Sequence, residues 1–277
     1  MLLLDQLPSA SADDRHLKTK TAKLVAGLSS CDKLFLAFSG GADSALLAFF
    51  AHNILHDKFQ AVYFATPLAP AEEKAEAEAL AMQIGCKLKV CVLNPLELNE
   101  VRNNLPSRCY FCKKLMLTAL KKMAVNAMCC DGSNADDAKE YRPGAQALAE
   151  LNIVSPLADA GLNKKEIRSL ARFCGLSVWD KPSSPCLATR FPYNCLLTEE
   201  NLEQVRQGEL ILHQAGFNPC RLRVHNNLAR VQLEKNNQAA FLAADTAGLY
   251  KLGFDFVTLD IAGLTSGDFD KKEKINE

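Results

Sequence analysis

The sequence predicts an α/β protein in which a Rossmann-like parallel sheet, covered by helices, is followed by a smaller α+β domain. Two observations carry this prediction. Up to about residue 193, short apolar runs alternate with longer helix-like segments. Beyond that point the order changes to a helix, two short strands, a further helix and a last strand. We therefore expect two domains, residues 1–195 and 196–277.

The first domain is expected to consist of strands that alternate with helices. Short apolar runs predict strands over 33–38, 61–67, 87–93 and 127–132. Longer runs predict helices over 13–29, 44–55 and 70–84 and one that begins near Cys109. Gly85 closes the helix over 70–84, because glycine readily takes the left-handed conformation after a helix end. Ligand sites in such sheets lie beyond the carboxyl ends of the strands, which is where the motifs described below fall.

The second domain is predicted from caps and turns. Thr198 is expected to cap a helix that ends at Gly216, with a glutamate at or beside its third position. Strands over 220–225 and 228–233 flank Asn226-Asn227, a typical hairpin turn. A helix over 237–250 and a strand over 256–263 complete the domain, and the charged residues 270–277 are expected to form a solvated tail.

Composition and charge narrow the class of protein. The 277 residues include 32 Lys and Arg and 32 Asp and Glu, so the formal net charge is zero and no overall positive field attracts nucleic acid. The amino-terminal apolar run is too short for a signal peptide or a spanning helix. Eleven cysteines, an odd number, argue against a disulfide framework. We expect a cytoplasmic protein with mostly reduced thiols that binds neither nucleic acid nor membrane.

A glycine-rich string between the first strand and the second helix predicts a phosphate-binding loop. It reads Ser39-Gly40-Gly41-Ala42-Asp43-Ser44. Paired glycines let backbone N–H groups approach phosphate oxygens, and the following helix adds its amino-terminal dipole. The hydroxyls of Ser39 and Ser44 can bond to phosphates, and Asp43 can orient Mg²⁺. The alternative interpretation is a plain turn between strand and helix.

Two further features refine the phosphate-binding interpretation. The chain has no GxxxxGK[ST] motif, so Walker-type chemistry at the γ-phosphate is not indicated. Asp131 and Gly132 begin the string Asp-Gly-Ser-Asn at the end of the fourth strand. This second loop is expected to complete the same site from the opposite side.

Three cysteines are candidates for a shared site. Cys109 and Cys112 lie three residues apart at a predicted helix start and thus share a helix face. The helix terminus, with Arg108 and Lys113, is expected to lower the pKa of both thiols. Cys186 lies in the proline-rich string KPSSPCLATR. A structural zinc site and a redox dithiol remain alternative interpretations, although zinc prefers a fourth ligand and the sequence has no second CxxC motif.

The other cysteines are expected to be packing residues. Cys129 and Cys130 are adjacent in a strand, so their side chains should face opposite ways. Packing is likewise the interpretation for Cys31, Cys86, Cys91, Cys174, Cys195 and Cys220.

SGGADS, RCYFCK, DGSNADD followed by YRPG (141–144), and KPSSPCLATRFPYN together resemble the LarE family of ATP-dependent sulfur transferases. SGGADS by itself resembles the PP-loop of the ATP pyrophosphatase superfamily, which implies an adenine nucleotide alpha hydrolase-like fold. RLRVHNNLARVQL and LDIAGLTSG extend the resemblance into the small domain. The sequence departs from the family at Gln232, where an acidic residue is usual, and at GLTSGD (263–268), where GYRSGS is usual.

The resemblance implies a reaction and its cofactors. ATP, with Mg²⁺, adenylates the carboxylates of pyridinium-3,5-biscarboxylic acid mononucleotide and releases pyrophosphate. A sulfur nucleophile then displaces AMP to leave thiocarboxylates, in the biosynthesis of the nickel-pincer nucleotide of lactate racemase. Cys186 matches a sulfur-donating cysteine that some members sacrifice. Other members hold a [4Fe–4S] cluster on three cysteines, and we favour this version because Cys109, Cys112 and Cys186 fill those positions. A homo-oligomer, a hexamer, is also implied.

Basic residues receive roles in this scheme. Lys113 is expected to stabilise the adenylate phosphate, and Arg190 to bind a substrate carboxylate or phosphate by a forked contact. Arg221 and Arg223 share one strand face and are expected to hold the nucleotide phosphate, the alternative being a solvated edge strand. Glu209 is expected on the surface.

Three rival functions remain. A tRNA thiolase can combine a PP-loop with a three-cysteine cluster, but it needs a surface that neutralises phosphates. An amide-forming PP-loop enzyme has no need of CxxC together with Cys186. An iron–sulfur or zinc-binding module without enzymatic activity leaves SGGADS without a purpose.

Overall fold

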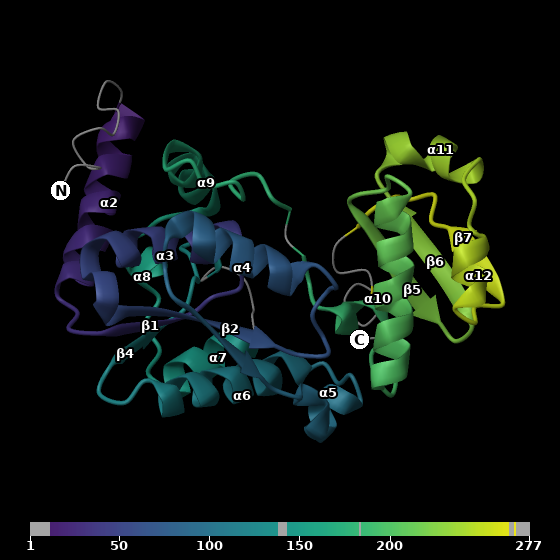
Figure 1. Ribbon diagram of the computed structural model, residues 1–277, viewed down its shortest axis with the longest axis horizontal. Coiled ribbons are helices and arrows are strands. Elements are labelled where there is room, and N and C mark those ends of the chain that lie inside the picture. Colours follow the sequence, from purple (N-terminus) through teal and green to yellow (C-terminus); the bar gives the residue numbers. More distant parts are fainter. Residues whose placement is uncertain (1–11, 138–142, 183, 266–268, 270–277) are drawn as a thin grey trace, which may run out of the picture. The chain divides into compact units, whose positions relative to one another are not determined.

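The computed structural model describes residues 12–137, 143–182, 184–265 and 269. They form two compact units (Figure 1). The first unit comprises the described residues within Met1–Ala65, Glu72–Leu93 and Cys109–Ser183, and the second those within Thr66–Ala71, Asn94–Arg108 and Ser184–Glu277. The second unit thus takes in two earlier segments as well as the carboxyl-terminal part, so the two-domain division at residue 195 stays a prediction.

The described part of the first unit contains a four-stranded sheet in the order β3-β2-β1-β4. Its paired strands run parallel, which confirms the predicted fold class. The strands are β1 (Leu34–Ala37), β2 (Phe59–Ala65), β3 (Leu88–Val92) and β4 (Met128–Cys130). Beyond β4, Val154 pairs in parallel with Cys130 and extends the sheet by a single bridge.

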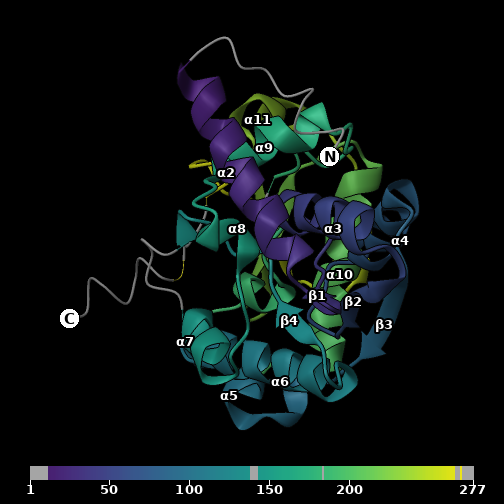
Figure 2. The ribbon, with the colours of Figure 1, turned by 90° about the vertical axis from the view of Figure 1, so that its left-hand side faces the viewer.

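Helices cover both faces of this sheet (Figure 1). One face packs against α2 (Ala12–Ser29), α3 (Ala42–Leu55), α4 (Glu73–Ile84), α8 (Pro156–Asp159) and α9 (Lys164–Phe173). The opposite face packs against α6 (Arg108–Met123) and α7 (Pro143–Glu150). Figure 2 shows α2 lying along the same side as α3 and α8. A short 3-10 turn, η1 (His56–Lys58), leads into β2.

Side chains alternate across the sheet as a β-strand requires. Leu34 and Leu36 enter the core beneath α3, whereas Phe35 enters the core beneath α6. Cys130 belongs to the first core and Cys129 to the second. The prediction that the two adjacent thiols face opposite ways is therefore confirmed.

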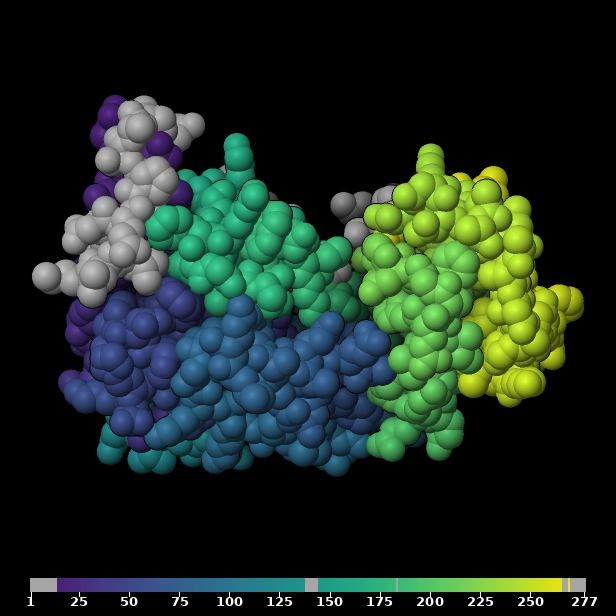
Figure 3. Space-filling view, turned by 45° about the horizontal axis from the view of Figure 1, so that its top comes forward, coloured from purple at the N-terminus to yellow at the C-terminus, as the bar shows by residue number. Residues whose placement is uncertain are grey.

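Polar contacts join α4 to the segment that follows α9. The Gln83 side chain donates to Gly175 O at 2.8 Å and accepts from Ser177 Oγ at 2.9 Å. Figure 3 shows the corresponding surfaces side by side. Gly85 follows α4 with φ = +81° and donates its N–H to Ala81 O, as predicted from the sequence.

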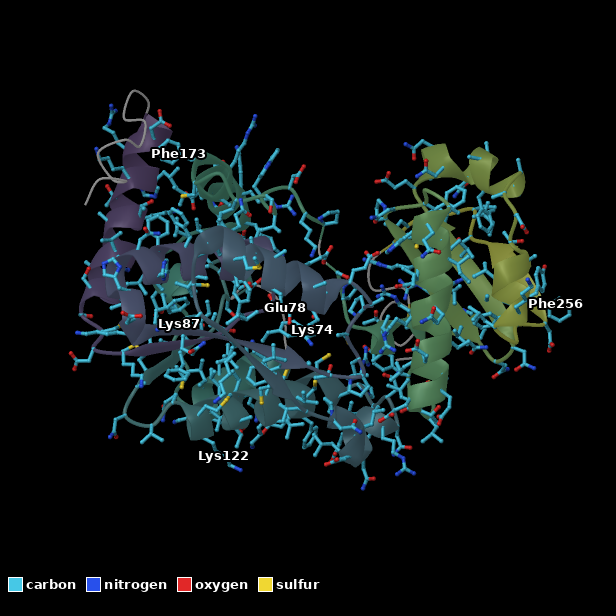
Figure 4. All side chains as sticks on the ribbon, in the orientation of Figure 1. Lys74, Glu78, Lys87, Lys122, Phe173 and Phe256 are labelled. Atoms are coloured by element: carbon cyan, nitrogen blue, oxygen red, sulfur yellow. The ribbon has the colours of Figure 1, made fainter. Side chains whose placement is uncertain are left out.

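The described part of the second unit contains a three-stranded sheet in the order β5-β6-β7. β5 (Cys220–His225) and β6 (Leu228–Leu233) are antiparallel around the Asn226-Asn227 turn, as predicted, and β7 (Phe256–Leu259) runs parallel to β6. Phe256 projects away from these strands and is 65% exposed (Figure 4). The other elements are η2 (Pro95–Glu97), α5 (Asn99–Arg102), η4 (Leu187–Arg190), α10 (Glu199–Gln214), η5 (Lys235–Asn237), α11 (Gln238–Leu242) and α12 (Ala247–Lys251).

One local prediction for this unit needs correction. The single helix expected over 237–250 is wrong, because α11 ends at Leu242 and α12 begins at Ala247. The Asp245 carboxylate accepts the Ala247 N–H at 2.9 Å, a local bond of the kind that competes with a continuous helix. Thr198 caps α10 as predicted, with Asn201 as the third residue of its capping box and Glu200 beside it.

Among the helices that the structure describes, none has both the length and the apolar character needed to cross a membrane.

Candidate functional site

The glycine-rich string forms a tight loop between β1 and α3. Gly40 has φ = +73°, and a Cβ atom at this position would lie 3.2 Å from Ala77 Cβ and 3.3 Å from Ala77 Cα. Glycine is therefore required at position 40 for two reasons: the positive φ angle and the close approach of α4. Gly41 is the N-cap of α3 and offers no side-chain acceptor to the first N–H groups of that helix. These donors suit an anion at the helix end.

The two serines of the loop are bound to each other. Ser39 Oγ and Ser44 Oγ lie 3.1 Å apart, and Ser44 Oγ also donates to Gly41 O at 3.1 Å. Ser39 is exposed, whereas Ser44 is 3% exposed. Ser39 is thus the more accessible hydroxyl for a phosphate, and Ser44 shapes the loop.

The loop that follows β4 meets the phosphate loop directly. β1 and β4 are adjacent parallel strands, so their carboxyl ends lie side by side. The Asn134 side chain donates to Asp43 Oδ2 at 3.0 Å. A Cβ atom on Gly132 would lie 3.0 Å from Ser44 N, so glycine permits this close approach. The two strings that the sequence assigned to one site are therefore brought together.

Asp131 is a heavily bonded carboxylate of the second loop. It is 6% exposed and accepts bonds from Lys113 Nζ at 2.9 Å and from the Ser133 and Ser155 hydroxyls at 2.7 Å each. Burial by itself raises the pKa of Asp131, but the Lys113 charge and the hydroxyl donors outweigh it and lower that pKa. Asp131 is therefore an anion that fixes the Lys113 ammonium group beside the loop.

Ser155 is a site residue that the sequence reasoning missed. It follows Val154, whose N–H donates to Cys129 O and whose carbonyl accepts from Asp131 N, so the strand-like bridge carries Ser155 to the sheet edge. The signal in the sequence is the short apolar pair Ile153-Val154 ahead of Ser-Pro.

Asp43 lies in an environment that calls for a cation. Burial raises its pKa and the charge of Asp137 adds to this effect, whereas the Asn134 bond, Lys164 and Arg168 oppose it. A divalent cation would favour the ionised carboxylate, and carboxylate oxygens are ligands that Mg²⁺ prefers. The half-buried carboxylate thus fits the predicted role. Lys164 and Arg168 of α9, which the sequence reasoning did not single out, add positive charge on this side.

The three candidate cysteines are divided between the two units. Cys109, which is exposed, and Cys112, which is half-buried, lie near the start of α6 in the first unit. Cys186 is half-buried at the start of η4 in the second unit. Within the described residues, no group of three or more His, Cys, Asp or Glu side chains is placed to hold a metal ion. The shared cysteine site therefore stays a prediction.

Several of the other cysteines behave as packing residues. Burial raises the pKa of the Cys86 and Cys174 thiols to about 11, and it also raises the pKa of Cys130. These groups stay protonated at neutral pH and pack as small apolar side chains.

Arg190 and Glu209 form a buried ion pair in the second unit. Arg190 Nε and Nη2 donate to the two Glu209 oxygens at 2.8 and 3.1 Å, and the side chains are 3% and 7% exposed. The expectation that Glu209 lies on the surface is wrong, because this residue of α10 faces β5 and also accepts the Leu222 N–H. The guanidinium fork predicted to bind a substrate anion is directed at Glu209 here, and its contact with substrate stays a prediction.

Arg221 and Arg223 lie on one face of β5, as predicted, but the alternative of a solvated edge strand is wrong. Arg221 is 8% and Arg223 2% exposed. Arg223 donates to the Gln232 side chain at 2.7 Å, to Thr189 O at 2.8 Å and to Thr265 O at 3.0 Å. Gln232, which is 0% exposed, in turn donates to Asp260 Oδ2 at 2.7 Å. The arginines thus belong to a buried polar network.

Parts of three strings that carry the resemblance, residues 141–142, 183 and 266–268, lie outside the described residues.

A parallel sheet with a glycine-rich loop after one strand, and an aspartate loop after its neighbour, defines a PP-loop nucleotide-binding protein. In agreement, the family profile described as NAD synthase matches residues 17–108.

Comparison with known proteins identifies the family more closely. The chain is 36% identical over 258 residues to the pyridinium-3,5-bisthiocarboxylic acid mononucleotide synthase of Lactiplantibacillus plantarum, covering 91% of this chain and 94% of that protein. It is 35% identical over 263 residues to an uncharacterized protein of Synechocystis, with 92% and 98% covered. An uncharacterized protein of Methanocaldococcus jannaschii is 32% identical over 205 residues, with 73% and 78% covered. The chain belongs to the LarE family and is an ATP-dependent enzyme.

Proposed function

We propose that the enzyme adenylates the carboxylates of pyridinium-3,5-biscarboxylic acid mononucleotide and converts them to thiocarboxylates, a step in the biosynthesis of the nickel-pincer nucleotide. The observation that carries the adenylation half is the junction of the two loops, where Asn134 bonds to Asp43 and Lys113 is held on Asp131. The activity for which the Lactiplantibacillus relative is named supports the choice of substrate.

The first step is attack of a carboxylate oxygen on the α-phosphorus of ATP. Backbone N–H groups of Ser39–Ser44 bind the phosphates, and Asp43 would hold Mg²⁺, which when bound would neutralise charge on the departing diphosphate. Lys113, fixed by Asp131, stabilises negative charge on the α-phosphate. The product is an acyl adenylate, in which AMP is a good leaving group.

The second step replaces oxygen by sulfur. A sulfur nucleophile attacks the acyl carbon, the bond from that carbon to the AMP oxygen breaks, and a thiocarboxylate remains. AMP therefore leaves with one of the original carboxylate oxygens. Arg221 and Arg223 are proposed to hold the phosphate of the substrate nucleotide, since guanidinium groups bind phosphate in a bidentate manner.

The proposed sulfur source is a [4Fe–4S] cluster held by Cys109, Cys112 and Cys186. Three thiols form a suitable donor set, and two of them share one turn of α6. Held by these three thiols, such a cluster would supply sulfide to the acyl adenylate. The alternative is that Cys186 gives up its own sulfur, so that each chain acts once.

Oxygen transfer tests the proposed reaction. With ¹⁸O-labelled biscarboxylic acid and unlabelled ATP, the AMP formed should carry one ¹⁸O atom and the acid should gain sulfur. AMP without label would rule out the acyl adenylate. Sulfur transfer to tRNA in place of the acid would instead establish the thiolase.

Iron and labile-sulfide analysis of anaerobically purified protein tests the sulfur source. We expect about four irons per chain, as three cysteine ligands on a cubane imply. Iron-free protein whose Cys186 loses the mass of one sulfur after reaction would establish the sacrificial route instead.

A further inference from the structure

The segment 185–192, which carries Cys186, is held in part through Glu209 and Asn104, two side chains that have no part in the proposed chemistry. We propose that Glu209, acting through Arg190, is a positioning residue that fixes the backbone around Cys186 for sulfur transfer. This inference rests on the proposed function, because it takes Cys186 as a residue of the sulfur-transfer step.

The contacts of Arg190 reach the peptide groups on both sides of Cys186. While Nε and Nη2 bond to Glu209, Nη1 donates to Pro185 O at 2.9 Å and to Thr189 Oγ1 at 2.9 Å. Thr189 Oγ1 donates in turn to Cys186 O at 2.8 Å. The carbonyl before Cys186 and the carbonyl of Cys186 itself are thus both bound to one guanidinium-centred group.

Glu209 anchors this group to the sheet of the second unit. Its Oε1 atom accepts both Arg190 Nε and the Leu222 N–H, the latter at 2.9 Å. A continuous set of bonds therefore runs from β5 through Glu209 and Arg190 to Pro185. Charge-assisted forked bonds are strongly directional, so the pair transmits a defined orientation.

A second side chain holds the far end of the same segment. Asn104, which is 0% exposed, donates from Nδ2 to Pro192 O at 2.7 Å and lies 3.3 Å from Phe191 O. The Leu187 N–H also donates to Leu68 O at 2.8 Å. With both ends fixed, removal of the Glu209 contact releases the part next to Cys186 without freeing the whole segment.

Energetics favour a positioning role over simple stabilisation. A buried ion pair pays a desolvation cost for both charges, and apolar residues of similar size are often as stable. The Arg190–Glu209 pair is almost completely buried, yet its third donor is used on the segment that bears Cys186. An apolar pair in the same place would lose the bond to Pro185 O and with it the fixed backbone geometry at Cys186.

The test compares Glu209→Gln with Glu200→Gln, which removes an exposed carboxylate from the same helix. Diphosphate release on addition of ATP and the biscarboxylic acid should stay within about twofold in both variants, whereas thiocarboxylate formed by Glu209→Gln should fall about 10- to 100-fold, as small misplacements of reacting groups do. Iodoacetamide labelling of the purified full chain, resolved by mass spectrometry, should be about fivefold faster at Cys186 and unchanged at Cys86 and Cys174.

A paired variant covers the case in which Glu209→Gln does not fold. Arg190→Met with Glu209→Leu removes both charges and keeps an apolar core, yet it loses the bond to Pro185 O. It should show the same loss of sulfur transfer and the same labelling at Cys186, with a cooperative thermal transition that shows the chain to be folded. Iron content, measured on each sample, shows whether the thiols still hold their metal.

Two results would overturn the proposal. Unchanged thiocarboxylate yield and unchanged Cys186 labelling in the paired variant would reduce the ion pair to a packing element. A raised KM for the acid with Cys186 labelling unaltered would make Arg190 a substrate-binding residue. Absence of diphosphate release by the unaltered enzyme would refute the proposed function instead, and the labelling result would still report on the ion pair.

Discussion

The phosphate loop of the first unit and the arginine network of the second are built in opposite ways. The loop Ser39–Ser44 presents backbone groups and short side chains from one continuous string. The network consists of long charged side chains, and Arg190 and Arg223 are only 3% and 2% exposed. Their partners come from distant segments, such as Glu209 on α10 and Gln232 on β6. A site made from backbone is thus encoded locally, whereas a site made from paired side chains depends on the whole unit.

The two regions also differ in how their charges are compensated. Burial raises the pKa of Asp43, and the charges of Lys164 and Arg168 oppose this effect without cancelling it. In the second unit, Arg190 and Arg223 already have acceptors within the chain. A cation bound with ATP would therefore relieve the first region, while an anion bound at the second must add to bonds that exist. Variants in the first region should mainly affect catalysis, and variants in the second should affect catalysis and folding together.

The largest effect is expected from Gly40→Ala. The new Cβ atom would lie only 3.2 Å from Ala77 Cβ, and the alanine would have to adopt φ = +73°. We therefore expect the loop to shift away from the phosphates. Diphosphate release should fall about 100-fold or more, because misplaced donors lose their stabilisation of the transition state. Gly175→Ala is the matched control, since Gly175 has φ = +72° but no neighbour within 4 Å. Equal activity of the two variants would contradict the role of the loop.

Lys113→Met should have the next largest effect. Loss of the ammonium group leaves Asp131 without its cation and removes positive charge from the α-phosphate, so kcat for diphosphate release should fall roughly 100-fold. Lys122→Met, on the same helix at an exposed position that projects away from α6 (Figure 4), should have no effect on this rate. Steady-state rates at saturating ATP distinguish the two.

Arg223→Lys probes the second region. A lysine keeps the charge but cannot bond at once to Gln232, Thr189 and Thr265. The KM for the acid should rise about tenfold, as expected for a lost forked contact of about 1.4 kcal/mol, and the KM for ATP should not change. Thermal unfolding should also occur at a lower temperature, unlike that of Lys122→Met. An unchanged melting temperature would remove the contrast between the two regions.

The smallest effect is expected on stability, from Asp43→Asn without ligands. The pKa of Asp43 is raised in the folded protein, so its ionisation costs folding free energy as the pH rises from the ordinary value of 3.8 through the folded-state pKa. The variant should therefore melt at a higher temperature at pH 7, lose this advantage below pH 3.8, and gain nothing from Mg²⁺ and ATP.

A carboxylate of opposite character provides the control for this experiment. The bond to Lys87 lowers the pKa of exposed Asp57, so Asp57→Asn should not raise the melting temperature. A stabilising effect of both substitutions would show that general charge, rather than the burial of Asp43, is responsible.

The same contrast explains what could be predicted from the sequence. The strands beside SGGADS and DGSN were predictable because apolar runs and glycine pairs act over a few residues. The burial of Glu209 and of Arg221 was not, because it depends on strand pairs and helix packing between distant segments. Ser155 was not predicted as a site residue because the single bridge at Val154 is too short to give a strand pattern in the sequence. The break between α11 and α12 depends on one Asp245 contact in a run that otherwise favours a helix.

The fate of the ATP phosphates is the most direct test of the claim that Ser39–Ser44 directs attack to the α-phosphorus. ATP labelled separately at its α- and γ-phosphates should be incubated with the enzyme, Mg²⁺ and the biscarboxylic acid. We expect the γ-label in diphosphate, the α-label in AMP, and no turnover without the acid. Release of orthophosphate and ADP would contradict the account, whatever the cysteines contribute.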